Sequence, residues 1–164
     1  IFATHTQAWD DVNSVIARAK QVNTLNQFII GKNIPEDEPI IVLGDLNINY
    51  YRYDNEGISE EGAMLLRVLK TDHTLPINGK ILPFTSDFSK NSMVCSSEQK
   101  LLDYIIFPTR KNIAIFTEQN RIIVFRSPDM HKHNNGTGNL NLDLSDHFGL
   151  ASKVTWMHKV VHEF

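Results

Sequence analysis

The first strong pattern in the chain is that of an amphipathic helix. Apolar residues recur at helical spacing after the acidic pair Asp10 and Asp11, and Gly31 follows them. Acidic residues favour the start of a helix and glycine favours its end, so we predict a helix over residues 12–31 that packs by one face. The apolar positions of this face are Val12, Ile16, Ala19, Val22, Leu25 and Ile29.

A second helical pattern begins at Ser59, which is followed by two glutamates and an apolar stripe. Serine is a preferred N-cap residue, and glutamates suit the first turn of a helix. We therefore predict a second helix that ends near Thr71 and contributes its stripe to the core. The stripe consists of Met64, Leu65, Val68 and Leu69.

Between and after these helices the pattern changes to short apolar runs. Residues 40–43 form a continuous apolar run that is typical of a strand buried on both faces, and Gly44 ends it. Two connections, residues 86–100 and 126–143, are long for a compact domain, which favours a binding role or mobility. Further short strands are predicted over residues 81–85, 101–107, 113–117, 122–125 and 149–154.

Composition narrows the class of protein. The 164 residues, 41% hydrophobic and 21% charged, fit one globular unit with its own core. A net charge of −3 lacks the positive field typical of nucleic-acid binding, and the single Cys95 excludes an intrachain disulfide.

No apolar run approaches the roughly 20 residues of a membrane span. Residues 1–4 read as the second half of a strand without an initiator methionine or a signal region, so we expect an upstream portion.

Candidate chemistry begins where the buried strand ends, at Gly44-Asp45-Leu46-Asn47. In extended chain Asp45 and Asn47 would face the same side. A carboxylate and an amide could then present oxygen ligands to a hard cation such as Mg²⁺ and to its bound phosphate. The alternative is an ordinary Asp/Asn turn at a strand end.

A second candidate is the pair Asp146-His147, where a polar loop enters an apolar run. Histidine titrates near neutrality, and a carboxylate partner can orient it as a general base for water. Asp103 could be that partner, because its charge would be costly in its apolar strand without a specific contact. The alternatives are a core histidine bonded to the backbone and a salt bridge from Asp103 to an arginine or lysine.

His5 follows an apolar run as Asp45 follows another. Both side chains would therefore lie at the same end of parallel strands, where open sheets place their ligands. There His5 could donate a proton or stabilise charge on a phosphoryl group.

The order of these motifs along the chain carries more information than any one of them. In sequence order they are Thr4-His5-Thr6-Gln7-Ala8, Arg18 with Gln21, Asn33-Ile34-Pro35, Gly44-Asp45-Leu46-Asn47, Phe84-Thr85-Ser86-Asp87 with Asn91-Ser92, Leu102-Asp103-Tyr104-Ile105, and Ser145-Asp146-His147-Phe148. This order resembles the endonuclease/exonuclease/phosphatase superfamily, and within it the bacterial-type neutral, magnesium-dependent sphingomyelinases. The resemblance covers most of the chain, and strand context agrees with the motifs, which makes an unrelated α/β domain a poor alternative.

The resemblance implies an α/β (α+β) fold, a two-layer β-sandwich flanked by helices in four layers. Residues 1–164 would be the C-terminal portion of a single phosphodiesterase catalytic domain. The implied reaction is magnesium-dependent hydrolysis of sphingomyelin to ceramide and phosphocholine by metal-activated water. A phospholipid, a peripheral membrane surface and a secreted or membrane-associated location are the implied partners and setting, ahead of nucleic acid.

The resemblance also implies roles for single residues. His147 would be the general base and Asp103 would orient it, while His5 would stabilise the leaving side. Thr85 and Asn91 would contact substrate. The residues implied around the phosphate and a one-metal or two-metal Mg²⁺ site are Asp45, Asn47, Asp146 and His147.

Two departures from the resembled family qualify these expectations. The Glu and Asn that complete the metal shell of the family lie upstream of Ile1, so an upstream segment or a partner chain is expected to complete the fold and the site. The family's aromatic-tipped hairpin before the last motif is replaced here by the polar residues 127–138, with only Met130 apolar near the tip, which is a poor lipid anchor. The alternatives are a nuclease or phosphoinositide phosphatase of the same superfamily, or an inactive fragment or binding module.

Overall fold

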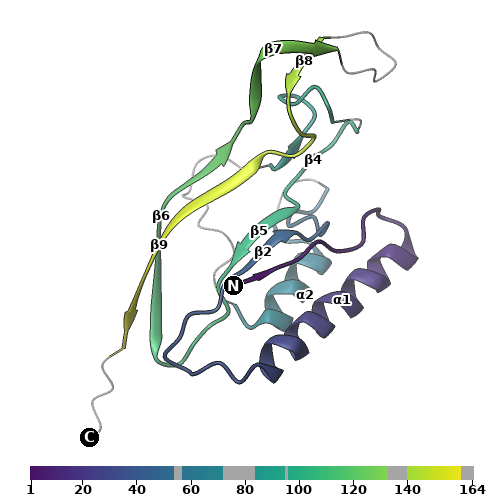
Figure 1. The fold of residues 1–164 in the computed structure, drawn as a ribbon. Helices are drawn as coiled ribbons and strands as arrows, with labels where there is room; N and C mark the ends of the chain where they lie inside the picture. The colour runs from purple at the N-terminus through teal and green to yellow at the C-terminus, as the bar shows by residue number, and fades with distance from the viewer. Residues whose placement is uncertain (54–56, 72–83, 95, 133–139, 160–164) are drawn as a thin grey trace, which may run out of the picture.

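The computed structural model describes residues 1–53, 57–71, 84–94, 96–132 and 140–159 (Figure 1). Strands and helices alternate over residues 2–69, and the elements described after them are all strands. Within this part of the chain, no helix combines the length and the apolar composition needed to cross a bilayer. The elements are β1 (Phe2–Ala3), α1 (Val12–Gly31), β2 (Val42–Asp45), α2 (Glu60–Leu69), β3 (Ser86–Asp87), β4 (Gln99–Lys100), β5 (Asp103–Ile106), β6 (Ile113–Ile123), β7 (Arg126–Lys132), β8 (Leu140–Asp143) and β9 (Gly149–His158).

The predicted bounds of the first helix are confirmed, but its predicted packing face is only partly correct. Asp11 caps α1, and its carboxylate accepts hydrogen bonds from the first free backbone N–H groups of the helix. Val12 and Ile16, which the apolar pattern placed in the core, are exposed. The reason is that the first half of α1 packs against a polar loop that follows β1. The buried side of α1 consists of Ser14, Arg18, Val22 and Ile29.

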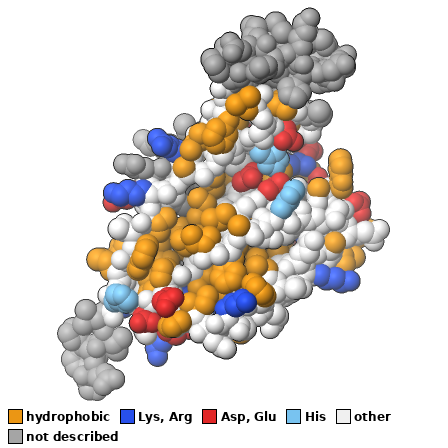
Figure 2. Space-filling view, viewed as in Figure 1, with side chains coloured by type: hydrophobic (Ala, Val, Ile, Leu, Met, Phe, Trp, Pro, Cys, Tyr) orange, Lys and Arg blue, Asp and Glu red, His pale blue; other side chains and the backbone are white. Residues whose placement is uncertain are grey.

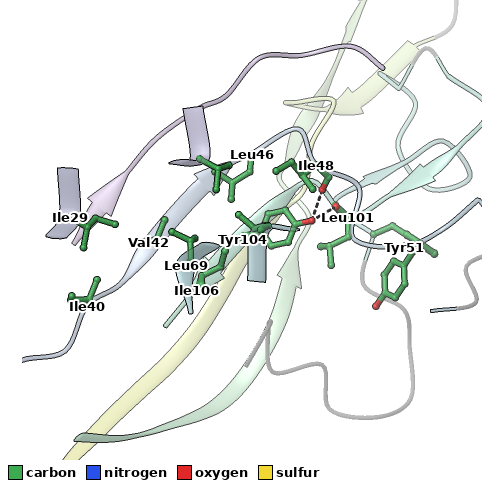
Figure 3. Packing of buried hydrophobic residues seen from close by; sticks show 13 residues of the cluster. Ile29, Ile40, Val42, Leu46, Ile48, Tyr51, Leu69, Leu101, Tyr104 and Ile106 are labelled. Carbon is green, nitrogen blue, oxygen red and sulfur yellow. Dashed lines mark hydrogen bonds between the residues drawn. The ribbon is translucent and has the colours of Figure 1, made fainter. Parts of the chain in front are cut away.

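The second helix agrees with its prediction in bounds and in packing. The Ser59 hydroxyl accepts a hydrogen bond from the backbone N–H of Gly62 at 2.9 Å, and the left-handed Lys70 ends the helix. Leu65 and Leu69 are buried, and Met64 and Val68 pack against the core cluster. Both helices lie on the same side of the β1–β2–β5 sheet (Figure 1), and the core fills the space between helices and sheet (Figure 3).

The central sheet has the order β1-β2-β5, with β1 parallel to β2 and β5 antiparallel to it. Tyr104 of β5 is buried, and its hydroxyl donates to the backbone carbonyls of Ile48 and Leu101 (Figure 3). These bonds satisfy the polar end of a core side chain and fix the segment that follows β2. In the β2–β5 register Asp45 lies directly opposite Asp103. The sheet therefore brings two predicted site residues together.

The C-terminal part of the chain forms longer strands than the sequence predicted. β6 runs through both strands predicted over 113–125, because it continues past an irregularity between Glu118 and Arg121 and pairs with β9. The predicted loop over 126–143 is wrong in part, since it contains the paired strands β7 and β8. The predicted loop over 86–100 likewise contains the short pair β3–β4. Residues 81–83 of a predicted strand and Cys95 lie outside the described residues.

Candidate active site

Three polar side chains from separate elements converge at one end of the central sheet. Asp45 ends β2, Asp103 begins β5, and His147 lies in the turn before β9. The Nδ1 atom of His147 lies 2.8 Å from Oδ2 of Asp103 and 3.8 Å from Oδ2 of Asp45. Each of the three side chains keeps 22–23% of its surface accessible. On the face shown in Figure 2, acidic and histidine side chains lie next to one another.

The electrostatics of this group follow from the sheet register. Two carboxylates directly opposite each other in an antiparallel pair repel, and the imidazole lies within reach of both. Burial raises the pKa of Asp45, with a smaller contribution from the charge of Asp103 and an opposing one from the hydrogen bond that Asn47 donates. The hydrogen bond to Asp103 raises the pKa of His147 above its usual value, although burial opposes this. His147 is therefore a stronger base than a free histidine.

Asp103 and His147 thus form the pair that the sequence suggested. The hydrogen bond at Nδ1 fixes the orientation of the ring and leaves Nε2 as the nitrogen for proton transfer. The alternatives of a core histidine bonded to the backbone and of a salt bridge from Asp103 to an arginine or lysine do not describe the geometry. The ring of His147 and the carboxylate of Asp103 contact each other instead. A positioned imidazole of this kind can take a proton from water.

Thr85, whose expected role as a substrate contact stays a prediction, lies inside the protein. Its side chain is fully buried, and its hydroxyl accepts hydrogen bonds from the backbone N–H groups of Leu102 and Asp103. Its carbonyl accepts from the N–H of Phe148 at 2.7 Å. The described geometry therefore supports a positioning role, in which Thr85 connects the strand that carries Asp103 to the residue after His147.

Asn91, the other expected substrate contact, is also buried. Its amide nitrogen donates to the carbonyl of Ser145 at 2.8 Å, and its amide oxygen accepts from the N–H of Met93. The Ser145 hydroxyl in turn accepts from the N–H of His147 at 3.2 Å. Asn91 therefore fixes the turn that presents His147 instead of facing solvent. The sequence showed Asn91 only as a polar motif residue in a long predicted loop, and its burial could not be read from the sequence.

Asn47 does not lie on the same extended strand as Asp45. It has a φ of 49°, so the chain leaves the extended conformation directly after β2. Its backbone N–H donates to Oδ1 of Asp45 at 2.9 Å, and its amide nitrogen donates to the carbonyl of Thr6 at 3.1 Å. The turn interpretation is thus correct for the backbone, and the argument from strand alternation is wrong.

The remaining expected residues lie at the edge of this group. Nε2 of His5 is 3.4 Å from Oδ2 of Asp45, and 70% of the His5 side chain is exposed. Asp146 is exposed and is not one of the side chains whose ligand atoms cluster. Its charge makes a minor contribution to the raised pKa of His147.

The loop that carries His5 is fixed by Arg18, which the sequence analysis named only as part of a motif. Arg18 is fully buried, and its guanidinium forms two hydrogen bonds with Glu61 of α2, at 2.9 and 2.7 Å. The same group donates to the carbonyls of Gln7 and Trp9. An arginine within the packed side of a helix is the sequence signal for this contact, because such a charge requires a partner.

The donor set suits a divalent cation. One ligand atom each from Asp45, Asp103 and His147 lies within 4.8 Å of the other two, and carboxylates are hard oxygen ligands of the kind that Mg²⁺ prefers. Nδ1 of His147 is already engaged by Asp103. Asp45 is therefore the side chain of this group whose carboxylate is best suited to an ion.

Outside this group, the carboxylate of Asp143 connects three segments of the chain: its own strand β8, the segment of Ser92 and the start of β7 at Arg126. Asp143 is 5% exposed, and its carboxylate accepts from the N–H and the hydroxyl of Ser92, at 3.0 and 2.7 Å, and from Nε of Arg126 at 3.0 Å. Burial acts to raise the pKa of Asp143, but these hydrogen bonds outweigh burial and hold the pKa below its usual value. We refer to these contacts as the Asp143 tie.

Asp143→Asn is expected to lower the free energy of unfolding at pH 7 by about 1.5–3 kcal/mol, because the amide loses charge-assisted hydrogen bonds. A depressed folded-state pKa gives stability that is present above the unfolded value of about 3.9 and is lost as the pH falls through the folded value. The difference between variant and wild type should therefore shrink below about pH 4. Urea unfolding at pH 7 and pH 3 measures this, and an equal loss at both would contradict it.

Comparison with known proteins gives the same family as the motifs. No family model matches the chain. The sphingomyelinase C of Listeria ivanovii is 31% identical over 156 residues, which are 90% of this chain and 44% of that protein. A sphingomyelinase C of Bacillus cereus is 28% identical over 163 residues, 94% of this chain and 47% of that protein.

Solved structures agree. The protein named SmcL has a TM-score of 0.68 and 29% identity, over 95% of this chain and 52% of that one. A beta toxin from Staphylococcus aureus has a TM-score of 0.64 and 25% identity, over 92% and 50%. The chain spans about half the length of the curated relatives that it matches. By sequence and by fold, the chain is similar to bacterial sphingomyelinases, in agreement with the resemblance carried by its motifs.

Proposed function

We propose that the protein takes part in magnesium-dependent hydrolysis of sphingomyelin to ceramide and phosphocholine. The observation that carries the proposal is the hydrogen bond of 2.8 Å between His147 and Asp103, beside the carboxylate of Asp45. It supplies an oriented base next to a ligand for a cation, which is what the hydrolysis of a phosphodiester by water requires. The relatives named sphingomyelinase C support the choice of substrate.

Each side chain has a distinct proposed task. His147 accepts the proton of the attacking water at Nε2, and Asp103 holds the ring and stabilises the imidazolium that forms. Asp45 and Asn47 would hold the ion, and Mg²⁺ when bound would supply charge neutralisation for the phosphoryl group. His5 is close enough to Asp45 to stabilise charge on the leaving side. The exposed Asp146 adds negative charge beside His147.

The substrate is tested by phosphocholine release from sphingomyelin vesicles in the presence of Mg²⁺. Release of phosphocholine from these vesicles, without cleavage of DNA or of a phosphoinositide, supports the proposal. Cleavage of DNA or of the phosphoinositide instead would keep the phosphodiester chemistry and discard the sphingomyelin substrate. The secreted or membrane-associated location expected from the resemblance is part of the same proposal.

Removal of divalent metal with EDTA is expected to reduce phosphocholine release to background, and added Mg²⁺ is expected to restore it. Without an ion, the carboxylates of Asp45 and Asp103 repel the phosphodiester anion. Isothermal titration of Mg²⁺ into the metal-free protein provides a reading that does not depend on turnover. Binding heat that persists unchanged in an Asp45→Asn variant would exclude Asp45 as a ligand.

A further inference from the structure

Trp9 stands out in the loop between β1 and α1. Its backbone φ is 77°, a conformation that is strained for a bulky aromatic residue, and 76% of the residue is exposed. The same loop carries His5, whose imidazole lies 3.4 Å from Asp45. A large exposed ring therefore lies a few residues along the chain from the candidate active site.

The backbone around Trp9 is held from several sides. The buried guanidinium of Arg18 donates to the carbonyls of Gln7 and Trp9, and Arg18 is itself fixed by Glu61. The N–H of Gln7 donates to the Gln21 side chain at 2.9 Å. These contacts together stabilise the strained backbone conformation, yet none of them buries the indole ring of Trp9. The protein thus maintains a costly backbone conformation that leaves an indole in solvent, and strain of this kind is concentrated at functional sites.

The charges near Trp9 restrict the surface that it could meet. Asp10 is paired with Lys100 at 2.7 Å, and Asp11 is used as the cap of α1. The neighbours of Trp9 along the chain are acidic, and the basic side chain beside them, Lys100, is already paired with Asp10 and Glu98, which disfavours an anionic bilayer. Val12 follows with 70% of its surface exposed, so the loop and the first turn of α1 present a small apolar point.

We propose that Trp9 docks the protein onto a zwitterionic, choline-lipid bilayer surface. Tryptophan is suited to the boundary between lipid chains and head groups, and its ring face attracts the quaternary ammonium of choline. The proposal rests on the proposed function for its biological meaning, because a choline-lipid surface is where the proposed substrate is found. Its test is binding with hydrolysis blocked, so the two can fail separately.

The first experiment uses Trp9 as its own reporter. The chain has two tryptophans, so Trp156→Phe leaves Trp9 as the only one. Vesicles of sphingomyelin and phosphatidylcholine, added in EDTA, are expected to shift its emission to the blue, and brominated phosphatidylcholine is expected to quench it. Unchanged emission, or a shift only with anionic phosphatidylserine vesicles, would overturn the proposal.

The second experiment separates docking from a structural role. Asparagine tolerates a positive φ, so Trp9→Asn keeps the backbone and removes the ring. Sedimentation is expected to show about tenfold weaker partition onto the zwitterionic vesicles, with an unchanged or higher melting temperature. Trp9→Phe should keep most of the partition, and Met157→Gln, which removes a 59% exposed apolar side chain of β9, should not alter it. Undiminished partition of Trp9→Asn would overturn the proposal, as would a loss matched by Met157→Gln.

Discussion

Replacing His147 with alanine is expected to lower phosphocholine release by about 10³-fold or more, with the loss in kcat and little change in KM. General base catalysis contributes about 10²–10⁴-fold. The ring of His147 is already oriented by Asp103 at 2.8 Å, so its removal takes away a preorganised base rather than a mobile one. Steady-state kinetics on sphingomyelin vesicles at saturating Mg²⁺ measures the effect.

Matched variants make this result specific. Asp103→Asn keeps the shape of the side chain but removes the negative charge that accepts the hydrogen bond from Nδ1–H of His147. A large loss in kcat is therefore also expected. His158→Ala, at the far end of β9, removes a histidine outside the site and should leave activity unchanged. Release by His147→Ala within threefold of wild type, with an unchanged circular dichroism spectrum, would remove His147 from the role of base.

Gly44→Ala is expected to have the largest effect on stability, about 3–5 kcal/mol in the free energy of unfolding. Gly44 has a φ of 135°, and a Cβ added there would lie 1.9 Å from the carbonyl oxygen of Thr4. Backbone atoms cannot yield as a flexible side chain can, so β1 would have to move away from β2. That movement breaks the bond from the N–H of Thr4 to the carbonyl of Leu43 and displaces His5.

Urea unfolding followed by circular dichroism measures this loss, and Gly31→Ala is the control. At Gly31 an added Cβ would meet nothing within 4 Å, and alanine favours a helix more than glycine does. The control should therefore change stability by less than about 1 kcal/mol. Equal effects of the two substitutions would show that β1 and β2 are not held together as closely as described.

Local rules predicted the helices and much of the site. Asp11 and Gly31 bracket α1 because caps and helix ends depend on neighbouring residues. Asp103 and His147 could be paired because a charge inside an apolar strand demands a partner. Asp45 joined them through the register of β2 and β5, which the sequence alone does not fix.

The differences between expectation and structure share a physical origin. Thr85 and Asn91, whose expected contact with substrate stays a prediction, make hydrogen bonds to backbone groups of residues 102–103 and 145. Val12 and Ile16 were expected in the core, yet α1 packs through Arg18 against the loop that precedes it, which leaves them exposed. Each outcome depends on which segments meet in space, and the spacing of residues along one segment carries no information about that.

The Asp143 tie has a consequence for how such a protein can diversify. Arg126 and Asp143 stand at the base of the β7–β8 pair, where they face each other in register and bond at 3.0 Å, and Ser92 joins them from another segment. The positions of Ser145 and His147 are thus fixed by contacts at the base of the β7–β8 pair. The sequence that connects β7 to β8 can therefore change during evolution while the contacts that hold Asp103 and His147 together are kept.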